Sequence, residues 1–324
     1  MVYEKEKQVA IAAVTKAAKL CVKVQGDRAG AAIEKPDQSP VTIADLGAQA
    51  VICQAIAAAF PNDAIVGEED STLLRQPAMT ESLQQVTTIV REIVPDATPE
   101  AVMDWIDRGN GEVGSRYWTL DPIDGTKGFL RNDQYAIALA LVEAGEVKLG
   151  VLGCPALPVD ANHPEGEQGV LFVAVRGQGT TMTSLHGGDS RTVHVAVEDP
   201  RCLYLTESVE SRHGNLPLQR AIAQAVGLTN PPLQLDSQVK YGVVARGQAA
   251  LYLRLPWTHF PNYRENIWDH AAGAIVVEEA GGRVTDMYGK PLDFNSGAKL
   301  VNNRGIVASN GTLHEAVLAK LREL

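Results

Sequence analysis

The feature that most constrains this chain is the stretch of residues 118–129, which reads WTLDPIDGTKGF. The apolar residues that lead into it predict a buried strand, and Pro122 should end that strand because proline fixes its own φ and has no backbone N–H to donate. The turn that follows can aim the carboxylates of Asp121 and Asp124 at one point, with the Ile123 carbonyl between them. Oxygen ligands of these two kinds suit hard cations such as Mg²⁺. We therefore expect a metal site at the end of this strand.

The next two residues fit the same interpretation. Gly125 allows a ligand to approach the backbone closely, and Thr126 offers a hydroxyl beside the expected metal. An ordinary surface turn is the alternative for the Asp-Gly-Thr part alone, since Asp, Pro and Gly all favour turns. Both interpretations stay open on these residues alone.

Composition and charge limit the classes of partner. The chain has 324 residues, 45% hydrophobic and 21% charged, which is typical of a globular protein of one large domain or two packed ones. Its net charge of −10, from 29 basic and 39 acidic residues, argues against a nucleic-acid polymer or an anionic membrane as partner. A small phosphate substrate stays compatible, because bound divalent metals reverse the local sign of a site.

Neither a bilayer-spanning apolar run nor an N-terminal targeting pattern is visible, so we expect a cytoplasmic protein, or an organellar one if a transit peptide was removed. Cys21, Cys53, Cys154 and Cys202 are scattered without metal-ligand spacing. We expect reduced and mostly buried thiols. The alternative is a redox-responsive pair, which the spacing does not assign.

The order of predicted elements indicates two halves. Residues 135–175 read as strands joined by short turns, which predicts an antiparallel sheet, whereas strands and helices alternate after residue 191. A polar, Gly-rich segment at 185–191 separates them. We expect an α+β domain over residues 1–190 and an α/β domain over 191–324.

Three further acidic residues are candidates for the same site. Asp45 follows Ser-Pro-Val-Thr at a predicted helix start, Glu68 follows a short strand in Gly-Glu-Glu-Asp, and Asp269 follows Trp268 at the start of an apolar helix expected to run from Asn266 to Glu279. Each has an ordinary structural alternative: a first-turn residue facing the helix dipole, a solvated acidic face, and an N-cap aspartate. Spacing alone favours those alternatives for Asp45 and Asp269.

The complete string from Trp118 to Phe129 resembles the signature of the lithium-sensitive, magnesium-dependent phosphatases, the superfamily of inositol monophosphatase and fructose-1,6-bisphosphatase. Its extension, Lys127-Gly-Phe-Leu-Arg131, is similar to the branch of 3'(2'),5'-bisphosphate nucleotidases. The resemblance covers nearly the whole chain, from Tyr3 to the last helix. It implies an α/β fold in which helices and sheets form an αβαβα sandwich.

The resemblance also implies a ligand set and a base. Asp45, paired with the Thr126 hydroxyl, would orient and deprotonate a water for in-line attack without a covalent intermediate. Glu69 is the less favoured neighbour of Glu68. Two or three Mg²⁺ would share Glu68, Asp121, the Ile123 carbonyl, Asp124 and Asp269.

A second group of residues is implied at the nucleotide. Resemblance of the segments DSQVKY and YLRLP to the family places Ser237, Lys240 and Arg254 at the retained 5'-phosphate and the ribose, and His213 near the adenosine. Gly125 and Thr126 would contact the substrate as well. The alternatives are a surface histidine at His213 and solvated charges at strand ends for Lys240 and Arg254. Asn266, where the family usually has lysine, bears on substrate preference.

Three functions follow as hypotheses. The leading one is hydrolysis of the 3'-phosphate of adenosine 3',5'-bisphosphate, giving AMP, with the sulfated analogue as a further substrate. An inositol phosphatase, for instance on inositol 1,4-bisphosphate, is the alternative within the class, and the segments 127–131 and 236–238 favour the nucleotide over it. A nucleotide-binding sensor without turnover is the non-enzyme alternative, which the complete carboxylate set disfavours. We expect a monomer or a weak homodimer.

Overall fold

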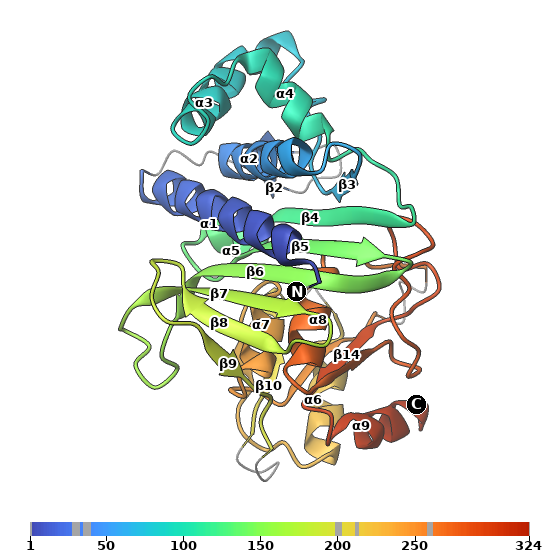
Figure 1. Ribbon diagram of the computed structural model, residues 1–324. Helices are drawn as coiled ribbons and strands as arrows, with labels where there is room; N and C mark the ends of the chain where they lie inside the picture. The colour runs from blue at the N-terminus through green and yellow to red at the C-terminus, as the bar shows by residue number, and fades with distance from the viewer. Residues whose placement is uncertain are drawn as a thin grey trace.

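The chain folds into alternating layers of helices and sheets, seen in a computed structural model that describes residues 2–27, 33–34, 40–197, 203–210, 214–257 and 262–323. Figure 1 shows these layers from top to bottom: helices, a large sheet, helices, a smaller sheet and helices again. The expected α/β fold and its αβαβα layering are confirmed.

The larger sheet is built from consecutive strands. Within the described residues its members are β3 (Ala64–Gly67), β4 (Arg116–Asp124), β5 (Ala136–Glu143), β6 (Glu146–Pro158), β7 (Gln168–Val175), β8 (Thr180–Ser184) and β9 (Arg191–Val193). Strands β3 and β4 are parallel, and each later pair is antiparallel. The β5–β6 turn uses Ala144 and Gly145, both with positive φ, as a two-residue hairpin with right-handed strand twist requires. The antiparallel sheet predicted over 135–175 is therefore present.

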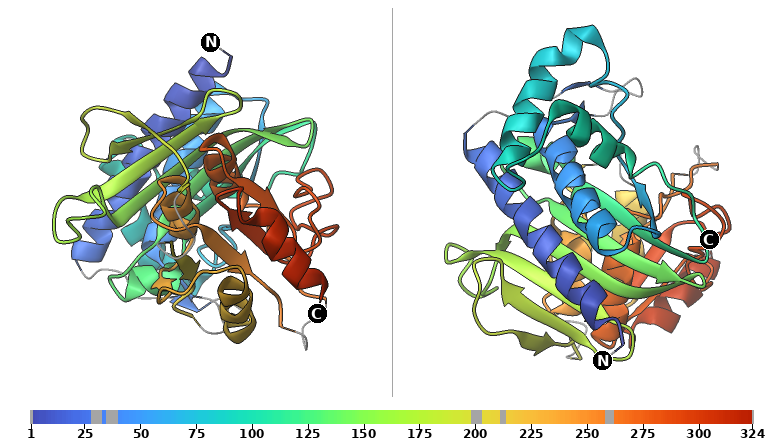
Figure 2. Two further views of the ribbon diagram at one scale, coloured as in Figure 1. Left: turned by 90° about the horizontal axis from the view of Figure 1, so that it is seen from below. Right: turned by 45° about the horizontal axis from the view of Figure 1, so that its top comes forward.

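Two long helices cover one face of this sheet. Figure 2 shows α1 (Glu4–Gly26) and α2 (Ile43–Ala59) lying side by side across the strands. Ile137, Leu139 and Leu141 alternate along β5 and enter the core shared with these helices. Since successive strand residues point to opposite faces, the residues between them must face the other side of the sheet.

That opposite face is lined with smaller residues and packs against α7 (Val239–Ala245) and α8 (Ala271–Glu279). The residues of β5 on this side include Ala136, Ala138 and Ala140. The approach of α8 is close: a Cβ added to Gly150 of β6 would lie 2.4 Å from the Ile275 side chain. Small residues on this face therefore let the middle helical layer sit directly on the sheet.

The smaller sheet forms the other wall of that layer. Its described strands, in spatial order, are β11 (Leu233–Gln234), β10 (Leu205–Glu207), β12 (Leu251–Arg254), β14 (Ile306–Ser309) and β13 (Arg283–Thr285). Strand β10 is parallel to both of its neighbours, and β14 is antiparallel to both of its own. Helices α6 (Leu216–Ala225) and α9 (His314–Arg322) cover its outer face through a third apolar core.

The remaining elements lie at the edges of the stack. They are β1 (Ile33–Glu34), β2 (Pro40–Val41), the 3₁₀ turn η1 (Pro77–Met79), α3 (Thr80–Arg91), α4 (Pro99–Asp107) and α5 (Thr126–Leu130). Strand β9 lies past the expected boundary at residue 190 yet pairs with the larger sheet, so the change of sheet falls between Val193 and Leu205. The division into two domains stays a prediction.

One helix start differs from the prediction. Helix α8 begins at Ala271, not at Asn266. The reason is long-range pairing: Asn266 forms an isolated bridge with Lys299, the Ile267 N–H donates to the Ala298 carbonyl at 3.0 Å, and the Leu300 N–H donates to the Glu265 carbonyl at 2.9 Å. These bonds hold the segment before α8 out of the helix.

Two simpler expectations concern membranes and thiols. Among the described helices, none combines the length and the apolar character needed to cross a membrane. Cys21, Cys53 and Cys154 are free and buried, as expected, and burial raises the pKa of each thiol. Cys202 lies outside the described residues.

Candidate active site

The end of β4 places the central acidic residue. The register between β4 and β5 shifts between Asp121 and Asp124, which marks the break expected at Pro122. Asp121 is only 2% exposed. Burial, followed by the negative charges of Glu68, Asp124 and Asp269 and a hydrogen bond with Glu68, raises the pKa of Asp121 well above its ordinary value. Four carboxylates from three separate segments thus lie close enough to affect one another.

Glu68 reaches this point because β3 runs parallel to β4 and ends beside it. The Glu68 N–H donates to the Leu120 carbonyl at 3.1 Å. The next residue, Glu69, is held by Gln49 of α2, whose side-chain amide donates to the Glu69 carbonyl and accepts from the Glu69 N–H at 3.1 Å. Glu69 is buried, so the alternative of a solvated acidic face does not hold for it.

Asp45 takes part in capping a helix and also contacts Thr126 of the candidate site. Thr42 is the N-cap of α2 and forms a capping box with Asp45, whose Oδ2 accepts from the Thr42 N–H at 2.8 Å. The Thr126 hydroxyl lies 3.3 Å from Asp45 Oδ1 and also 3.3 Å from the Ile123 carbonyl. The structural alternative and the predicted pairing with Thr126 are therefore both present, because they use different oxygens of one carboxylate.

Asp269 lies just before α8. His270 occupies the N-cap position of that helix and provides no side-chain cap, so the N-cap alternative for Asp269 is wrong. Burial, together with the charges of Asp124 and Glu265, raises the pKa of Asp269 to about 8 against the opposing effect of Arg254. This carboxylate belongs to the second half of the chain and completes the group around Asp121.

The two halves meet closely beside Asp124. Gly125 has φ 87°, and a Cβ placed there would lie 3.0 Å from that of Ser237, which itself has φ 61°. Arg131 of the nucleotidase-like extension forms ion pairs with Asp236 and with Glu210 at 2.5 Å. Arg131 thus ties the segment after β4 to the segment before α7.

Lys240 is buried in α7, at 2% exposure, so the alternative of a solvated charge at a strand end is wrong for it. Its ammonium donates to the Leu235 carbonyl at 3.2 Å and lies 5.3 Å from the centre of the Tyr252 ring. Burial lowers the pKa of Lys240 to about 8, with Asp124 opposing this shift and Arg254 adding to it. His213 lies outside the described residues.

Arg254 ends β12 and heads a chain of polar contacts. Its Nε lies 2.8 Å from Glu265 Oε2, which lies 3.4 Å from His270 Nε2. The other ring nitrogen of His270 is 2.8 Å from the Tyr241 hydroxyl. Burial alone would raise the pKa of Glu265, but Arg254 and His270 lower it to about 2.

A divalent cation fits the donor set around Asp121. Asp121 Oδ1 is buried and accepts no hydrogen bond within the described parts of the chain. The surrounding groups are hard oxygen donors that repel one another without a positive charge between them. Glu265 and His270, which also lie near Asp269, are less suited because Arg254 already neutralises Glu265.

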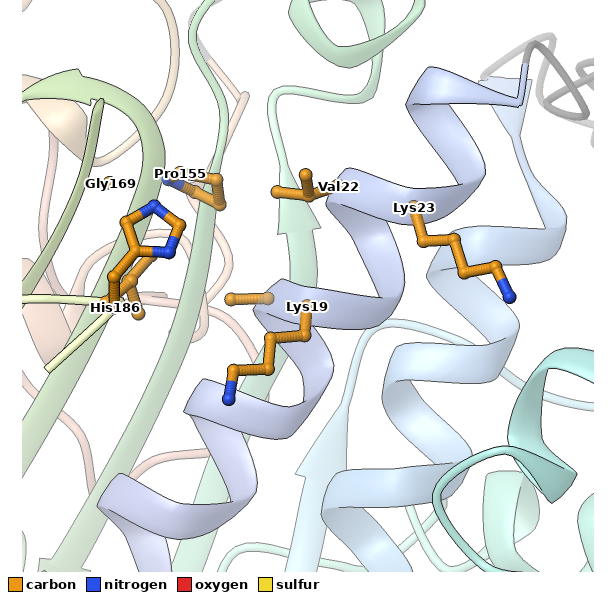
Figure 3. A pocket seen from close by; sticks show the side chains of 8 residues that line it. Lys19, Val22, Lys23, Pro155, Gly169 and His186 are labelled. Atoms are coloured by element: carbon orange, nitrogen blue, oxygen red, sulfur yellow. The ribbon is translucent and has the colours of Figure 1, made fainter. Parts of the chain in front are cut away.

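A separate hollow lies away from these acids. Figure 3 shows it between the C-terminal part of α1 and the residues around Pro155 and Gly169, with Lys19, Lys23 and His186 around its rim. Its volume is about 190 Å³, and no carboxylate lines it. It cannot supply the ligands of a hard cation and is not the candidate active site.

Several residues that build the site were not among the sequence predictions. Gln49 holds the backbone next to Glu68, Glu265 pairs with Arg254, and Gln238 contacts Asp124. Gln238 stands within the DSQVKY segment, but that pattern does not predict its contacts. The sequence carries no local signal for the other two.

Comparison with known proteins agrees with this geometry. The model of the "Inositol monophosphatase family" matches residues 3–324. The chain is 44% identical to a 3'(2'),5'-bisphosphate nucleotidase of Schizosaccharomyces pombe, over 98% of this chain and 95% of the relative. It is also 44% identical to a 3'(2'),5'-bisphosphate nucleotidase of Oryza sativa, over 99% and 94% of the two chains.

A solved structure is similar over the same extent. The IMPase of Thermotoga maritima superposes with a TM-score of 0.64 at 25% identity, covering 97% of this chain and 95% of that one. Both sheets and the helical layers between and around them therefore have counterparts in a known fold.

Proposed function

The chain belongs to the inositol monophosphatase family, within its 3'(2'),5'-bisphosphate nucleotidases, and from this premise we propose that it removes the 3'-phosphate of adenosine 3',5'-bisphosphate to give AMP and phosphate. The family implies dependence on a divalent metal. The observation that carries the proposal is the position of Asp121, whose buried oxygen lacks a partner while three other carboxylates surround it. A binding protein without turnover has no use for such a costly group of acids.

We propose that two or three Mg²⁺ bind to Glu68, Asp121, the Ile123 carbonyl, Asp124 and Asp269. When bound, they would polarise the phosphate, lower the pKa of a water and neutralise the leaving oxygen. The protein's task is to hold these oxygens together from both halves of the chain before the metal arrives.

The Asp45–Thr126 pair is the proposed base. The Thr126 hydroxyl is within reach of Asp45 Oδ1, so a proton taken from the attacking water can pass to that carboxylate through the hydroxyl. Asp45 Oδ2 stays bonded to Thr42, which keeps the other oxygen oriented toward the site. Phosphate transfer goes directly to water, without a covalent intermediate.

The nucleotide would be held mainly by the second half. Arg254 uses its Nε for Glu265 and donates from Nη2 to the Tyr263 hydroxyl over a long 3.5 Å, and its remaining guanidinium N–H groups would bind the 5'-phosphate. Lys240 and Ser237 would contribute positive potential and a hydroxyl near the ribose, with Gly125 allowing close approach. His213 is proposed near the adenosine from the resemblance alone. A monomeric or weakly dimeric state and a cytoplasmic location stay expectations from the sequence.

Phosphate release with Mg²⁺ tests this function. Adenosine 3',5'-bisphosphate, its sulfated analogue and inositol 1,4-bisphosphate should be compared side by side, with and without Li⁺ and with a chelator control. We expect a strong preference for the nucleotides that Li⁺ and the chelator both abolish. Equal or reversed preference would retain the metal chemistry and refute the nucleotide pocket, and no release from any substrate would favour the sensor.

A further inference from the structure

We propose that Gln238 is a positioning residue that joins the metal ligands of the two halves into one site, an inference that rests on the function proposed above. It belongs to neither the ligand set nor the nucleotide-binding residues. It is 1% exposed and lies where α7 begins. Its backbone and its side chain contact two different parts of the carboxylate group.

The backbone of Gln238 reaches the first half. Its N–H donates to Asp124 Oδ2 at 2.7 Å, across the junction between the larger sheet and α7. This bond uses one oxygen of Asp124 and fixes the orientation of the carboxylate. A charge-assisted bond of this kind is short and directional.

The side chain of Gln238 reaches the second half. Its Nε2 donates to the carbonyl of Trp268, the residue before Asp269, at 2.9 Å, and its Oε1 accepts from the Gly273 N–H at 3.0 Å. Both partners flank Asp269 in the chain. The amide therefore holds the Asp269 segment from both sides.

The start of α8 explains why this contact is needed. The first N–H groups of a helix have no partner inside the helix, and they need a cap from elsewhere. His270, at the N-cap, gives none, and Gly273 lies in the first turn. The amide of Gln238 supplies the missing acceptor from another helix. One side chain therefore both caps α8 and positions Asp269.

The residue before Gln238, Ser237, has an unusual backbone conformation that directs the Gln238 N–H. Ser237 adopts φ 61°, a left-handed conformation that is uncommon and unfavourable for a residue with a Cβ. The Ser237 hydroxyl accepts from the Val239 N–H at 3.2 Å, which compensates part of that cost. The left-handed turn points the Gln238 N–H back toward Asp124.

The test is Gln238→Met, which keeps the size of the side chain and removes both amide bonds. Mn²⁺ serves as the probe because it is a hard divalent cation whose binding is read directly by electron paramagnetic resonance, without turnover. We expect Mn²⁺ to bind roughly tenfold more weakly to the variant, as is typical when a residue that supports metal ligands is lost. The Mg²⁺ concentration for half-maximal phosphate release should rise by a similar factor.

Thr180→Val is the matched control. The Thr180 hydroxyl donates to the Val276 carbonyl at 2.8 Å, so this variant also removes one buried bond to α8, but far along the helix from Asp269. We expect unchanged Mn²⁺ affinity together with a modest loss of thermal stability. An equal loss of affinity in Thr180→Val would mean that any weakening of α8 has this effect, and the inference would fail.

Gln238→Asn covers the case in which the methionine variant does not fold. It keeps the amide but shortens its reach by one methylene, and a weaker Mn²⁺ affinity is expected again. If wild-type protein binds Mn²⁺ and a folded Gln238 variant binds it equally well, the inference is wrong while the proposed function stands. If the wild type binds no Mn²⁺, the metal site itself is refuted, and the inference with it.

Discussion

Glu265 and Asp269 are two carboxylates four residues apart in the chain, and their surroundings shift their pKa values in opposite directions. Against the effect of burial, Arg254 and His270 lower the pKa of Glu265 to about 2. Burial, with Asp124 and Glu265 nearby, raises the pKa of Asp269 to about 8. One carboxylate has its positive partners within the protein, and the other lies among further acids.

The same contrast separates two regions. The arginine network, made of Arg254, Glu265, His270 and Tyr241, links these four side chains through contacts of 2.8–3.4 Å. The carboxylate cluster consists of Glu68, Asp121, Asp124 and Asp269. In the arginine network a buried acid lies beside positive groups, whereas in the carboxylate cluster the neighbouring charges that raise the pKa of Asp121 are those of further acids. The first predictions below each alter one side of this contrast, and the last concerns a buried histidine outside both regions.

The largest effect is expected from Asp121→Asn in the carboxylate cluster. Losing this ligand should lower turnover about a thousandfold or more, since metal stabilisation is worth several kcal/mol and each 1.36 kcal/mol is a factor of ten. The rise in melting temperature that Mg²⁺ gives the wild type should vanish as well. Steady-state phosphate release and thermal unfolding with and without Mg²⁺ measure both.

Asp96→Asn is the control for that variant, because Asp96 is an exposed acid. It should leave both the rate and the Mg²⁺ effect unchanged. Near-normal turnover of Asp121→Asn would contradict the ligand assignment.

Arg254→Met tests the arginine network. Removing Arg254 leaves the charge of Glu265 buried without its ion-pair partner. The free energy of unfolding, measured by urea denaturation, should therefore fall by roughly 3–5 kcal/mol. The KM for adenosine 3',5'-bisphosphate should rise, and activity on an inositol phosphate should suffer less. An equal loss on both substrates would refute the assignment of Arg254 to the 5'-phosphate.

The double variant Arg254→Met with Glu265→Gln separates the two roles of Arg254. It should regain much of the stability, since no unpaired charge remains, while the KM stays high. If stability is not regained, the pair with Glu265 is not the source of the loss.

The smallest effect is expected at acidic pH, where protonation would place a positive charge on a buried histidine outside both regions. His314 is fully buried between the hydroxyls of Thr285 and Ser309, and burial lowers its pKa to about 4. The unfolded histidine, with its usual pKa near 6.5, binds a proton that the folded one does not, so stability is complete above about pH 6.5 and falls toward pH 4.

At pH 5 this linkage amounts to about 2 kcal/mol. Comparing the wild type with His314→Gln by urea denaturation at pH 7 and pH 5 isolates it, because the other titrating groups are common to both proteins. The wild type should lose more stability than the variant between these two values. Parallel losses would show that His314 does not carry the effect.

Local pattern was enough to predict much of the site. The apolar approach to Pro122 and the acids on both sides of it give strand β4 and its break, and the Thr42–Asp45 spacing gives the start of α2. Such features depend on neighbours within a few residues. The αβαβα layering, by contrast, came from family resemblance.

Long-range contacts are where local pattern is insufficient. The delayed start of α8 depends on pairing with residues 298–300, and the ion pair of Arg131 with Asp236 spans 105 positions. The sequence was compatible with a solvated charge at Lys240, but the structure shows that this side chain is buried. Nothing nearby in the chain reports such partners, since they depend on how the two sheets are brought together.

The middle helical layer also determines how the protein can be divided. Helices α7 and α8 fill the core between both sheets, so the alanine-rich face of β5 and the ring of Phe172 have no cover until residues beyond 239 are made. A fragment that ends before β10 would expose that face to water and should aggregate. During synthesis, the larger sheet therefore cannot bury this face until the last third of the chain has been made, and the smallest fragment expected to fold is the complete stack.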